Sequence, residues 1–209
     1  LLRLLNTLIG LGMVSKDEAT KVYRAGSVIV MRSPGLDELS ARIPAELKRL
    51  SGLTGRTSEW YVPGDGVMML SDRCEPEDCA VNVKARIGFE RELDGELEAV
   101  ARLALGCGAP RPAGKTAHWN YMNGKKAKIP ASKAAKLIAS AGKAGHCLDT
   151  EYNVNGVRRY AAAVRHADGN FVGIIAVAEN FTPDADSKAA STVRALLESA
   201  DRLSSMLKH

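Results

Sequence analysis

The sequence has no apolar run long enough to cross a membrane, although 45% of its 209 residues are hydrophobic. A membrane-spanning helix needs about 20 consecutive, predominantly apolar residues. The leucine-rich opening at residues 1–5 is too short for the apolar part of a secretory signal, and no cleavage site follows it. We therefore expect a cytoplasmic protein with no membrane association.

Cysteine is scarce, and its spacing is not that of a metal site. None of the four cysteines belongs to a Cys-x-x-Cys pair, and the four histidines are scattered along the chain. Structural zinc sites use closely paired ligands. Cys74 and Cys79 could face each other across a turn, as a disulfide or as half of a metal site, but their spacing favours two separate thiols.

The sequence also lacks the patterns that identify an active site. It contains no glycine-rich phosphate loop and no recognisable pair of nucleophile and base. We therefore predict no enzyme activity, no catalytic residues and no cofactor.

The charge of the chain is moderate and mixed in sign. Its 29 Lys and Arg residues exceed its 24 Asp and Glu residues by five, and charged residues make up 25% of the sequence. This is the composition of an ordinary globular protein, and a disordered chain would have fewer apolar residues. The positive excess allows a nucleic-acid partner without requiring one.

The first 26 residues have the pattern of a helix followed by a hairpin. In residues 1–11, leucines recur at helical spacing, and Gly12 follows as a helix stop. Two short apolar stretches, residues 13–15 and 22–26, then flank a charged turn. A helix leading directly into such a hairpin is typical of the second half of a winged helix-turn-helix.

The rest of the chain mixes strands and helices without strict alternation. Strands are predicted at residues 57–62, 66–73, 81–87, 157–165 and 170–179. Helices are predicted at residues 36–43, 44–52, 92–105, 132–141, with a cap at Ser132, and from 183 to near the end. Residues 106–130, rich in Gly, Pro and Lys, are predicted to form a mobile surface loop. This order favours an α+β fold with a mainly antiparallel sheet.

Several short motifs occur in an order that resembles IclR-family transcription regulators. They are Leu4-Leu5-Asn6-Thr7-Leu8, Tyr23-Arg24-Ala25-Gly26, Thr54-Gly55-Arg56-Thr57, Arg86-Ile87-Gly88, Gly156-Val157 and Asp168-Gly169. The resemblance covers nearly the whole chain. It implies a GAF-like effector domain, flanked by helices, behind the C-terminal part of a winged helix-turn-helix.

This resemblance also implies a domain organisation and partners. Residues 1–27 correspond to the remnant of the DNA-binding domain, 28–43 to a linker helix and 44–209 to the effector-binding domain. Family members form homodimers or tetramers and bind operator DNA with an affinity that a small organic effector changes. Because the family has two further helices before the recognition helix and this sequence starts at Leu1, we expect an N-terminal piece to be missing and expect DNA binding from the full-length protein.

Candidate DNA contacts lie in the helix and the hairpin. Recognition helices enter the major groove, and basic side chains beside them contact phosphates. The candidates are Arg3, Asn6, Lys16, Lys21 and Arg24. The alternative is that they are solvent-exposed surface residues with no role in binding.

The effector pocket implied by the resemblance lies on the concave face of the sheet. Its predicted lining is Asp149, Val157, Arg159, Ala176 and Ala178, with Leu93, Leu97 and Glu98 from the preceding helix. Alternation supports this, because residues 157, 159, 161 and 163 share one face of their strand. The family has smaller residues where this chain has Arg159.

Arg159 suggests the chemistry of the effector. A buried arginine is unfavourable unless it is paired, and a carboxylate can pair with it through two hydrogen bonds. We therefore predict a small organic acid as effector, with Asp149 or Glu98 as the partner in the empty protein. The alternative is that Arg159 faces solvent or a structural salt bridge, since most arginines are exposed.

Three aromatic residues, Trp60, Trp119 and Tyr121, could cover an aromatic ligand, although such residues more often lie in a core or an interface. A competing function is a GAF-like sensor or enzyme-like module with no role at DNA. The helix and hairpin of residues 1–26 favour the regulator.

Overall fold

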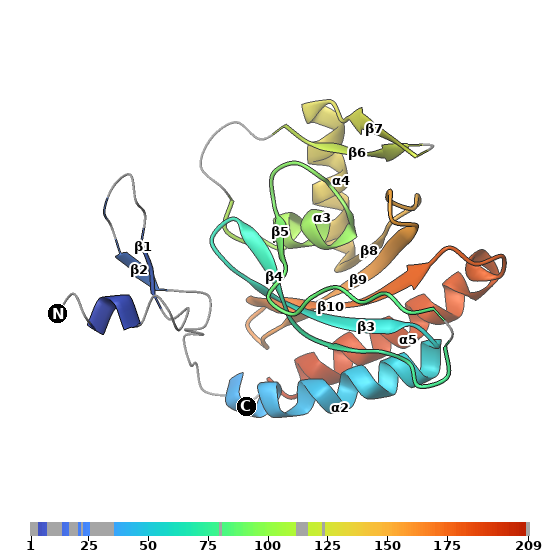
Figure 1. Ribbon diagram of the computed structural model, residues 1–209, viewed down its shortest axis with the longest axis horizontal. Coiled ribbons are helices and arrows are strands. Elements are labelled where there is room, and N and C mark those ends of the chain that lie inside the picture. Colours follow the sequence, from blue (N-terminus) through green and yellow to red (C-terminus); the bar gives the residue numbers. More distant parts are fainter. Residues whose placement is uncertain are drawn as a thin grey trace. The chain divides into compact units, whose positions relative to one another are not determined.

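The chain forms two compact units in the computed structural model, Leu1–Asp37 and Glu38–His209. The structure describes residues 4–7, 14–16, 21, 23–25, 36–79, 81–111, 117–122 and 124–207. Each unit is described by itself (Figure 1).

The small unit contains a helix and a hairpin, as predicted. Residues 4–7 are helical. Strands β1 (Val14–Lys16) and β2 (Tyr23–Ala25) pair antiparallel, with Val14 opposite Ala25. Between them in the sequence, Lys21 has a φ of 56°, in the left-handed region.

The large unit is built on a six-stranded antiparallel sheet with the strand order β5-β4-β3-β10-β9-β8. Its strands are β3 (Thr57–Pro63), β4 (Val67–Cys74), β5 (Glu90–Glu92), β8 (His146–Leu148), β9 (Val157–Arg165) and β10 (Phe171–Asn180). The long strands β9 and β10 are both interior strands, and all of their residues are buried or half-buried.

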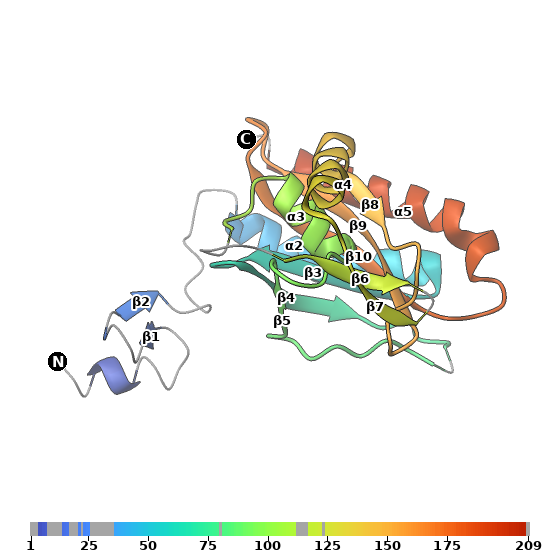
Figure 2. The same cartoon turned by 90° about the horizontal axis from the view of Figure 1, so that it is seen from above.

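Helices cover both faces of the sheet. α2 (Leu36–Thr54) and α5 (Ala185–Ser205) lie on one side, and α3 (Ala99–Gly106) and α4 (Ala131–Ala144) lie on the other (Figures 1 and 2). A separate hairpin of β6 (Trp119–Met122) and β7 (Lys125–Lys128) accompanies α3 and α4. The sheet is therefore the middle layer of a three-layer α+β unit.

The main core fills the space between the sheet and α3. Ala161 of β9 and Ile174 and Ala176 of β10 pack with the buried face of α3, including Val100 and Leu103. α3 and α4 approach each other through a glycine pair. A Cβ built on Gly142 would lie 2.1 Å from the carbonyl oxygen of Gly106, so only glycine fits there.

The predicted break at Pro44 does not occur. α2 runs unbroken from Leu36 to Thr54 with Pro44 inside it. Proline removes one helical hydrogen bond, but buried residues on one stripe continue across it. They are Leu39, Ile43, Leu47 and Leu50. The shared burial of this stripe keeps the two predicted helices as one.

The strand predicted at residues 81–87 was wrong. The segment belongs to none of the sheets in the described part of the chain, and side chains satisfy its backbone carbonyls. Thr57 Oγ1 donates to Val83 O at 2.9 Å, Asn180 Nδ2 donates to Val81 O at 3.1 Å, and an Arg73 guanidinium N–H donates to Ala85 O. The sheet continues instead through β5.

Three further predictions, on residues 92–132, were wrong in part. The helix expected over residues 92–105 begins only at Ala99, because Gly95 has a φ of 103° and Glu98 caps the helix. The mobile loop expected over 106–130 includes the ordered β6–β7 hairpin. α4 starts after Pro130 with no side-chain cap, so Ser132 does not serve as one.

Candidate functional site

A shallow, open depression lies on the α3 side of the sheet, where three segments meet. The chain before α3 contributes Glu96 and Glu98, and β6 contributes Asn120 and Tyr121. The region from β8 into β9 contributes Asp149, Glu151, Asn153, Val157 and Arg159. Because four of these nine residues are carboxylates, we call it the acidic depression.

Arg159 forms the buried side of the depression, and its charge is already paired. Its Nε and Nη2 donate to the two carboxylate oxygens of Glu59 at 2.8 and 3.2 Å, in a two-point fork. Glu59 is fully buried on the neighbouring part of the sheet and also accepts from Tyr61 OH at 2.9 Å. Burial raises the pKa of Glu59, but the charge and hydrogen bonds of Arg159 more than reverse this and lower the pKa.

Asp149 connects the depression to the start of α3. Its two carboxylate oxygens accept from the backbone N–H groups of Ala99 at 2.7 Å and Arg159 at 3.1 Å. Arg102 Nη2 lies 3.8 Å from Asp149 Oδ1. Burial, and then the negative charge of Glu98, raise the pKa of Asp149 to about 7. This carboxylate therefore titrates near neutral pH.

Glu98 has one oxygen engaged and one without a hydrogen bond. Oε1 accepts from Ala101 N at 3.3 Å and caps α3. Oε2 is buried with no hydrogen-bond partner, and Arg91 Nη1 lies 3.6 Å away. Next to it, burial and the charge of Glu98 raise the pKa of Glu96. This wall thus contains more carboxylate oxygens than the hydrogen bonds there satisfy.

The β6–β7 hairpin forms the remaining wall. Leu97 N donates to Trp119 O at 2.8 Å and Trp119 N donates to Gly95 O at 2.9 Å, which fastens the hairpin to the chain before α3. Trp119 and Tyr121 contact edge to face, with ring centroids 5.4 Å apart. Lys126 Nζ lies 3.6 Å from the centroid of the Trp119 ring. The aromatic pair thereby holds Tyr121 at the depression.

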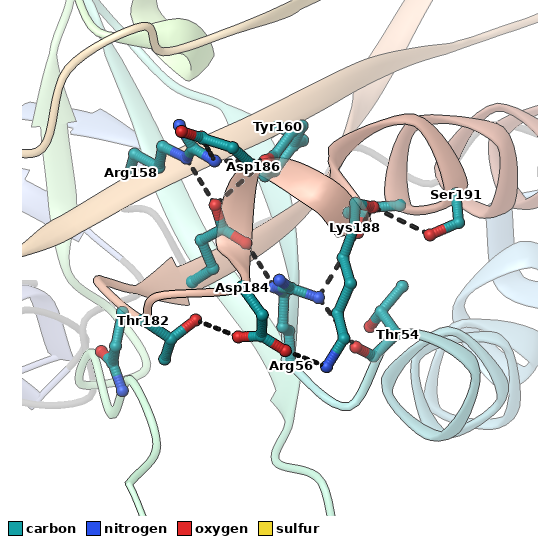
Figure 3. A network of polar contacts seen from close by, with 12 residues as sticks. Thr54, Arg56, Arg158, Tyr160, Thr182, Asp184, Asp186, Lys188 and Ser191 are labelled. Atoms are coloured by element: carbon teal, nitrogen blue, oxygen red, sulfur yellow. Dashed lines mark hydrogen bonds and ion pairs between the residues drawn. The ribbon is translucent and has the colours of Figure 1, made fainter.

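A second polar cluster lies on the opposite face of the sheet, beside α5 (Figure 3). Glu179 of β10 is buried and binds two guanidiniums, those of Arg56 and Arg158. Arg158 also reaches Asp186 of α5 at 2.8 Å, and Tyr160 OH donates to Glu179 at 3.0 Å. Every group in this cluster has a protein partner, so its role is to attach α2 and α5 to the sheet.

No protein-family model and no curated protein matches this sequence. Solved structures match it along nearly its whole length. The IclR transcriptional regulator from Alicyclobacillus acidocaldarius has a TM-score of 0.64 at 20% identity, over 98% of this chain and 83% of its own. Thermotoga maritima IclR gives 0.60 at 17% identity, over 99% of this chain and 84% of its own.

A third match is an IclR homolog from Microbacterium hydrocarbonoxydans complexed with 4-hydroxybenzoate. Its TM-score is 0.61 at 15% identity, over 98% of this chain and 83% of its own. The chain has the fold of IclR transcriptional regulators. This confirms the α+β class and the resemblance found in the sequence, and at these identities the likeness is one of fold.

Within this IclR fold, the predicted effector residues divide into two groups. Four of them line the acidic depression: Glu98, Asp149, Val157 and Arg159. The other four lie in the core at no more than 1% exposure and do not line it: Leu93, Leu97, Ala176 and Ala178. Leu93 and Leu97 were expected on a helix but lie in the chain before α3.

The partner of Arg159 is a residue that the sequence analysis did not name. Of the two alternatives to a ligand-binding role, the structural salt bridge is what the structure shows, and exposure to solvent is wrong, because Arg159 is 4% exposed and paired with Glu59. Asp149 and Glu98 were the expected partners, but Glu59 takes the fork. A signal existed, since Glu59 lies inside the predicted strand 57–62, directly before the apolar residues 60–62. Glu96, Asn120, Glu151 and Asn153 were also missed.

The aromatic candidates have different roles in the IclR fold. Tyr121 lines the depression, and Trp119 supports it from behind. Trp60 is 3% exposed and packs on Gly173, where a Cβ would lie 2.6 Å from its ring. Trp60 is therefore a core residue.

The candidate DNA contacts lie in the small unit. Asn6 is exposed on the helical segment, Lys16 is half-buried at the end of β1, and Lys21 is exposed in the turn. Arg24 belongs to β2. Arg3 lies outside the described residues.

The cysteines are all free, so Cys74 and Cys79 are not linked. In the part of the chain that the structure describes, no three His, Cys, Asp or Glu side chains are placed to hold a metal ion. None of the described helices is long and apolar enough to span a membrane.

Proposed function

We propose that the protein is a ligand-responsive transcription regulator of the IclR type. The observation that carries this proposal is the extent of the structural match. IclR regulators match 98% or more of this chain. Because the small unit has 37 of the 209 residues, a match of this extent includes it. A free-standing sensor would have no use for a helix and hairpin of this kind.

The small unit is the proposed DNA-binding part. Its helical segment followed by the β1–β2 hairpin has the order of a recognition helix and wing. Basic residues occur in the hairpin and its turn, where phosphate contacts are expected: Lys16, Lys21 and Arg24. We propose operator DNA as the partner, bound by a homodimer or tetramer.

The acidic depression is the proposed effector site. It combines polar side chains from three separate segments, so a ligand bound there would connect α3, the β6–β7 hairpin and β9. One neighbour of the same fold is complexed with 4-hydroxybenzoate, which supports a small organic molecule as the effector class.

The acidic effector predicted from the sequence finds little support at this site. That prediction assigned the guanidinium of Arg159 to a carboxylate of the ligand. Glu59 already forms both hydrogen bonds of the fork, and an incoming acid would have to displace it from a fully buried position.

DNA binding by the whole gene product tests this function. We expect the protein to bind a DNA fragment from upstream of the gene that encodes it, with an affinity that falls steeply as salt rises. Replacing Lys16 and Lys21 by Gln should weaken binding and reduce the salt slope, while Lys136→Gln on α4, exposed in the large unit, should change neither. If the protein binds no fragment even at low salt, the function is that of a sensor without a role at DNA.

A further inference from the structure

Negatively charged side chains outnumber positively charged ones in the acidic depression and among the residues that contact its lining. The carboxylates are Glu59, Glu96, Glu98, Asp149 and Glu151. The cations are the guanidiniums of Arg91, Arg102 and Arg159 and the ammonium of Lys126, whose charge acts on Glu96. Three pairs are within 4 Å: Arg159–Glu59, Arg102–Asp149 and Arg91–Glu98. The carboxylates are therefore in excess by one, and two of them form no ion pair with a described residue.

The two carboxylates outside these pairs are Glu96 and Glu151. Neither takes part in an ion pair within the described part of the chain. Glu96 is half-buried and Glu151 is exposed, and both line the depression. They stand on different segments, one before α3 and one after β8, so a ligand between them would meet negative charge from two sides.

Glu98 gives independent evidence that a hydrogen-bond donor is missing. The residue is 6% exposed, and its Oε2 has no hydrogen bond. A buried carboxylate oxygen without a hydrogen-bond donor is unfavourable. Arg91 Nη1 is too far for a hydrogen bond, at 3.6 Å. The negative charge of Glu98 is thus only loosely compensated by Arg91, and a cation bound in the depression would add a second positive charge near it.

The arrangement favours an organic cation over a metal ion. The carboxylates, imidazoles and thiols of the described residues include no group of three placed to bind a metal. The lining adds the Tyr121 ring and the side-chain amides of Asn120 and Asn153. Aromatic rings and carboxylates together are the usual surroundings of bound ammonium groups.

We propose that the effector carries a protonated amine or a guanidinium group, which binds in the acidic depression against Glu96, Glu98 and Glu151. This inference rests on the proposed function, since it names the chemistry of the effector of that same site. The depression is shallow and open, so a ligand bound there is small and stays partly exposed to solvent. An anion would instead lie beside two carboxylates that form no ion pair with a described residue, and like charges repel.

The crowding of carboxylates supports the same chemistry. Burial and neighbouring negative charge raise the pKa values of Glu96 and Asp149. A cation bound beside them relieves this repulsion without the uptake of a proton.

Ligand-observed NMR with the whole protein tests the inference. The probes are two sets of three compounds, each set having the same apolar group with an amine, an alcohol or an acid. One set is benzylamine, benzyl alcohol and benzoate, and the other is propylamine, propanol and propionate. Propylguanidine is a further cation. We expect the cations to bind, and the alcohols and acids to bind more weakly or not at all. The double variant Glu96→Gln/Glu151→Gln should reduce cation affinity by at least about tenfold, as the loss of a charge-assisted hydrogen bond does.

Glu90→Gln is the matched control, because Glu90 is exposed on β5 and outside the depression. It should leave cation affinity unchanged. The inference is overturned if the acids bind better than the amines, if no cation binds at millimolar concentration, or if the double variant binds cations as the parent does.

The NMR experiment contains no DNA, so its outcome is separate from that of the proposed function. An acid that binds the depression and changes DNA affinity would overturn this inference and leave the regulator intact. Cation binding by a protein that binds no DNA would support this inference and overturn the proposed regulator.

Discussion

Replacing Glu59 by Gln should destabilise the large unit strongly, because Glu59 neutralises the buried charge of Arg159. The carboxylate accepts three hydrogen bonds, two from Arg159 and one from Tyr61, at 0% exposure. Glutamine keeps one acceptor oxygen and removes the negative charge. Arg159 is then left buried, at 4% exposure, with no ion-pair partner within the described residues.

The expected loss is about 3 kcal/mol of unfolding free energy, at the lower end of the 3–5 kcal/mol typical of a broken buried pair. The lower end applies because Glu98 and Asp149 still interact with the guanidinium. For a unit of this size, the unfolding midpoint should fall by roughly 6–12 °C. Urea unfolding, followed by circular dichroism, measures the free energy.

A double-mutant cycle separates the pair from its surroundings. Arg159→Met alone should also destabilise, because it leaves the Glu59 carboxylate buried with Tyr61 as its donor. Glu59→Gln combined with Arg159→Met should cost clearly less than the two single losses together. A Glu59→Gln variant as stable as the parent, or a cycle with no coupling, would refute the buried fork.

Three further predictions concern other residues. Since burial raises the pKa of Asp149 to about 7, the folded protein holds this proton more tightly than the unfolded chain. Its contribution to stability is therefore full below about pH 4 and is lost as pH rises through about 7. The urea unfolding midpoint should decline less with rising pH in Asp149→Asn than in the parent or in the control Glu151→Gln. Parallel pH profiles for all three proteins would contradict the pKa shift. Gly142→Ala should lower the thermal midpoint by several degrees, because its Cβ would meet the Gly106 backbone at 2.1 Å, whereas Gly52→Ala, with nothing within 4 Å, should be neutral or stabilising. The affinity for amines, measured by NMR, should increase as pH rises from about 6 to about 8. The reason is that Asp149, which faces Glu98, Arg102 and Arg159, becomes ionised over that range. Tighter binding at the lower pH would contradict this.

The strands that carry the clearest alternation were predictable from the sequence. β9 and β10 match their predicted ranges within one residue, since apolar alternation and an Asp-Gly turn define them locally. The same alternation over residues 81–87 was misleading. Whether an alternating segment becomes a strand depends on an available partner, and here Thr57, Arg73 and Asn180 bind its carbonyls instead.

The site was predictable only in part, because its charge pairs join distant residues. The sequence identified Arg159 and Asp149 by their place on β9 and before it, and both line the depression. It could not show that Glu59, 100 positions away, meets Arg159 across the sheet. Leu93 and Leu97 have helical spacing, yet Gly95 turns the chain between them, and both become core residues outside α3.

The acidic depression also depends on the β6–β7 hairpin, which the amino-acid composition of residues 106–130 did not predict. Residues 106–130 contain the Gly, Pro and Lys that usually indicate a loop. The Trp119–Tyr121 contact and two backbone hydrogen bonds to residues 95 and 97 order this hairpin and bring Asn120 and Tyr121 to the site. Such contacts are tertiary and leave no local pattern.

The most direct test of the account is the affinity of the protein for its upstream DNA, measured by fluorescence anisotropy with and without the amine that binds most tightly in the NMR experiment. The account predicts that saturating amine changes DNA affinity at least about fivefold, the size of a typical coupling between two sites, and that Glu96→Gln/Glu151→Gln abolishes the change while still binding DNA. An affinity that is the same with and without every ligand that occupies the depression would contradict a regulator controlled from this site.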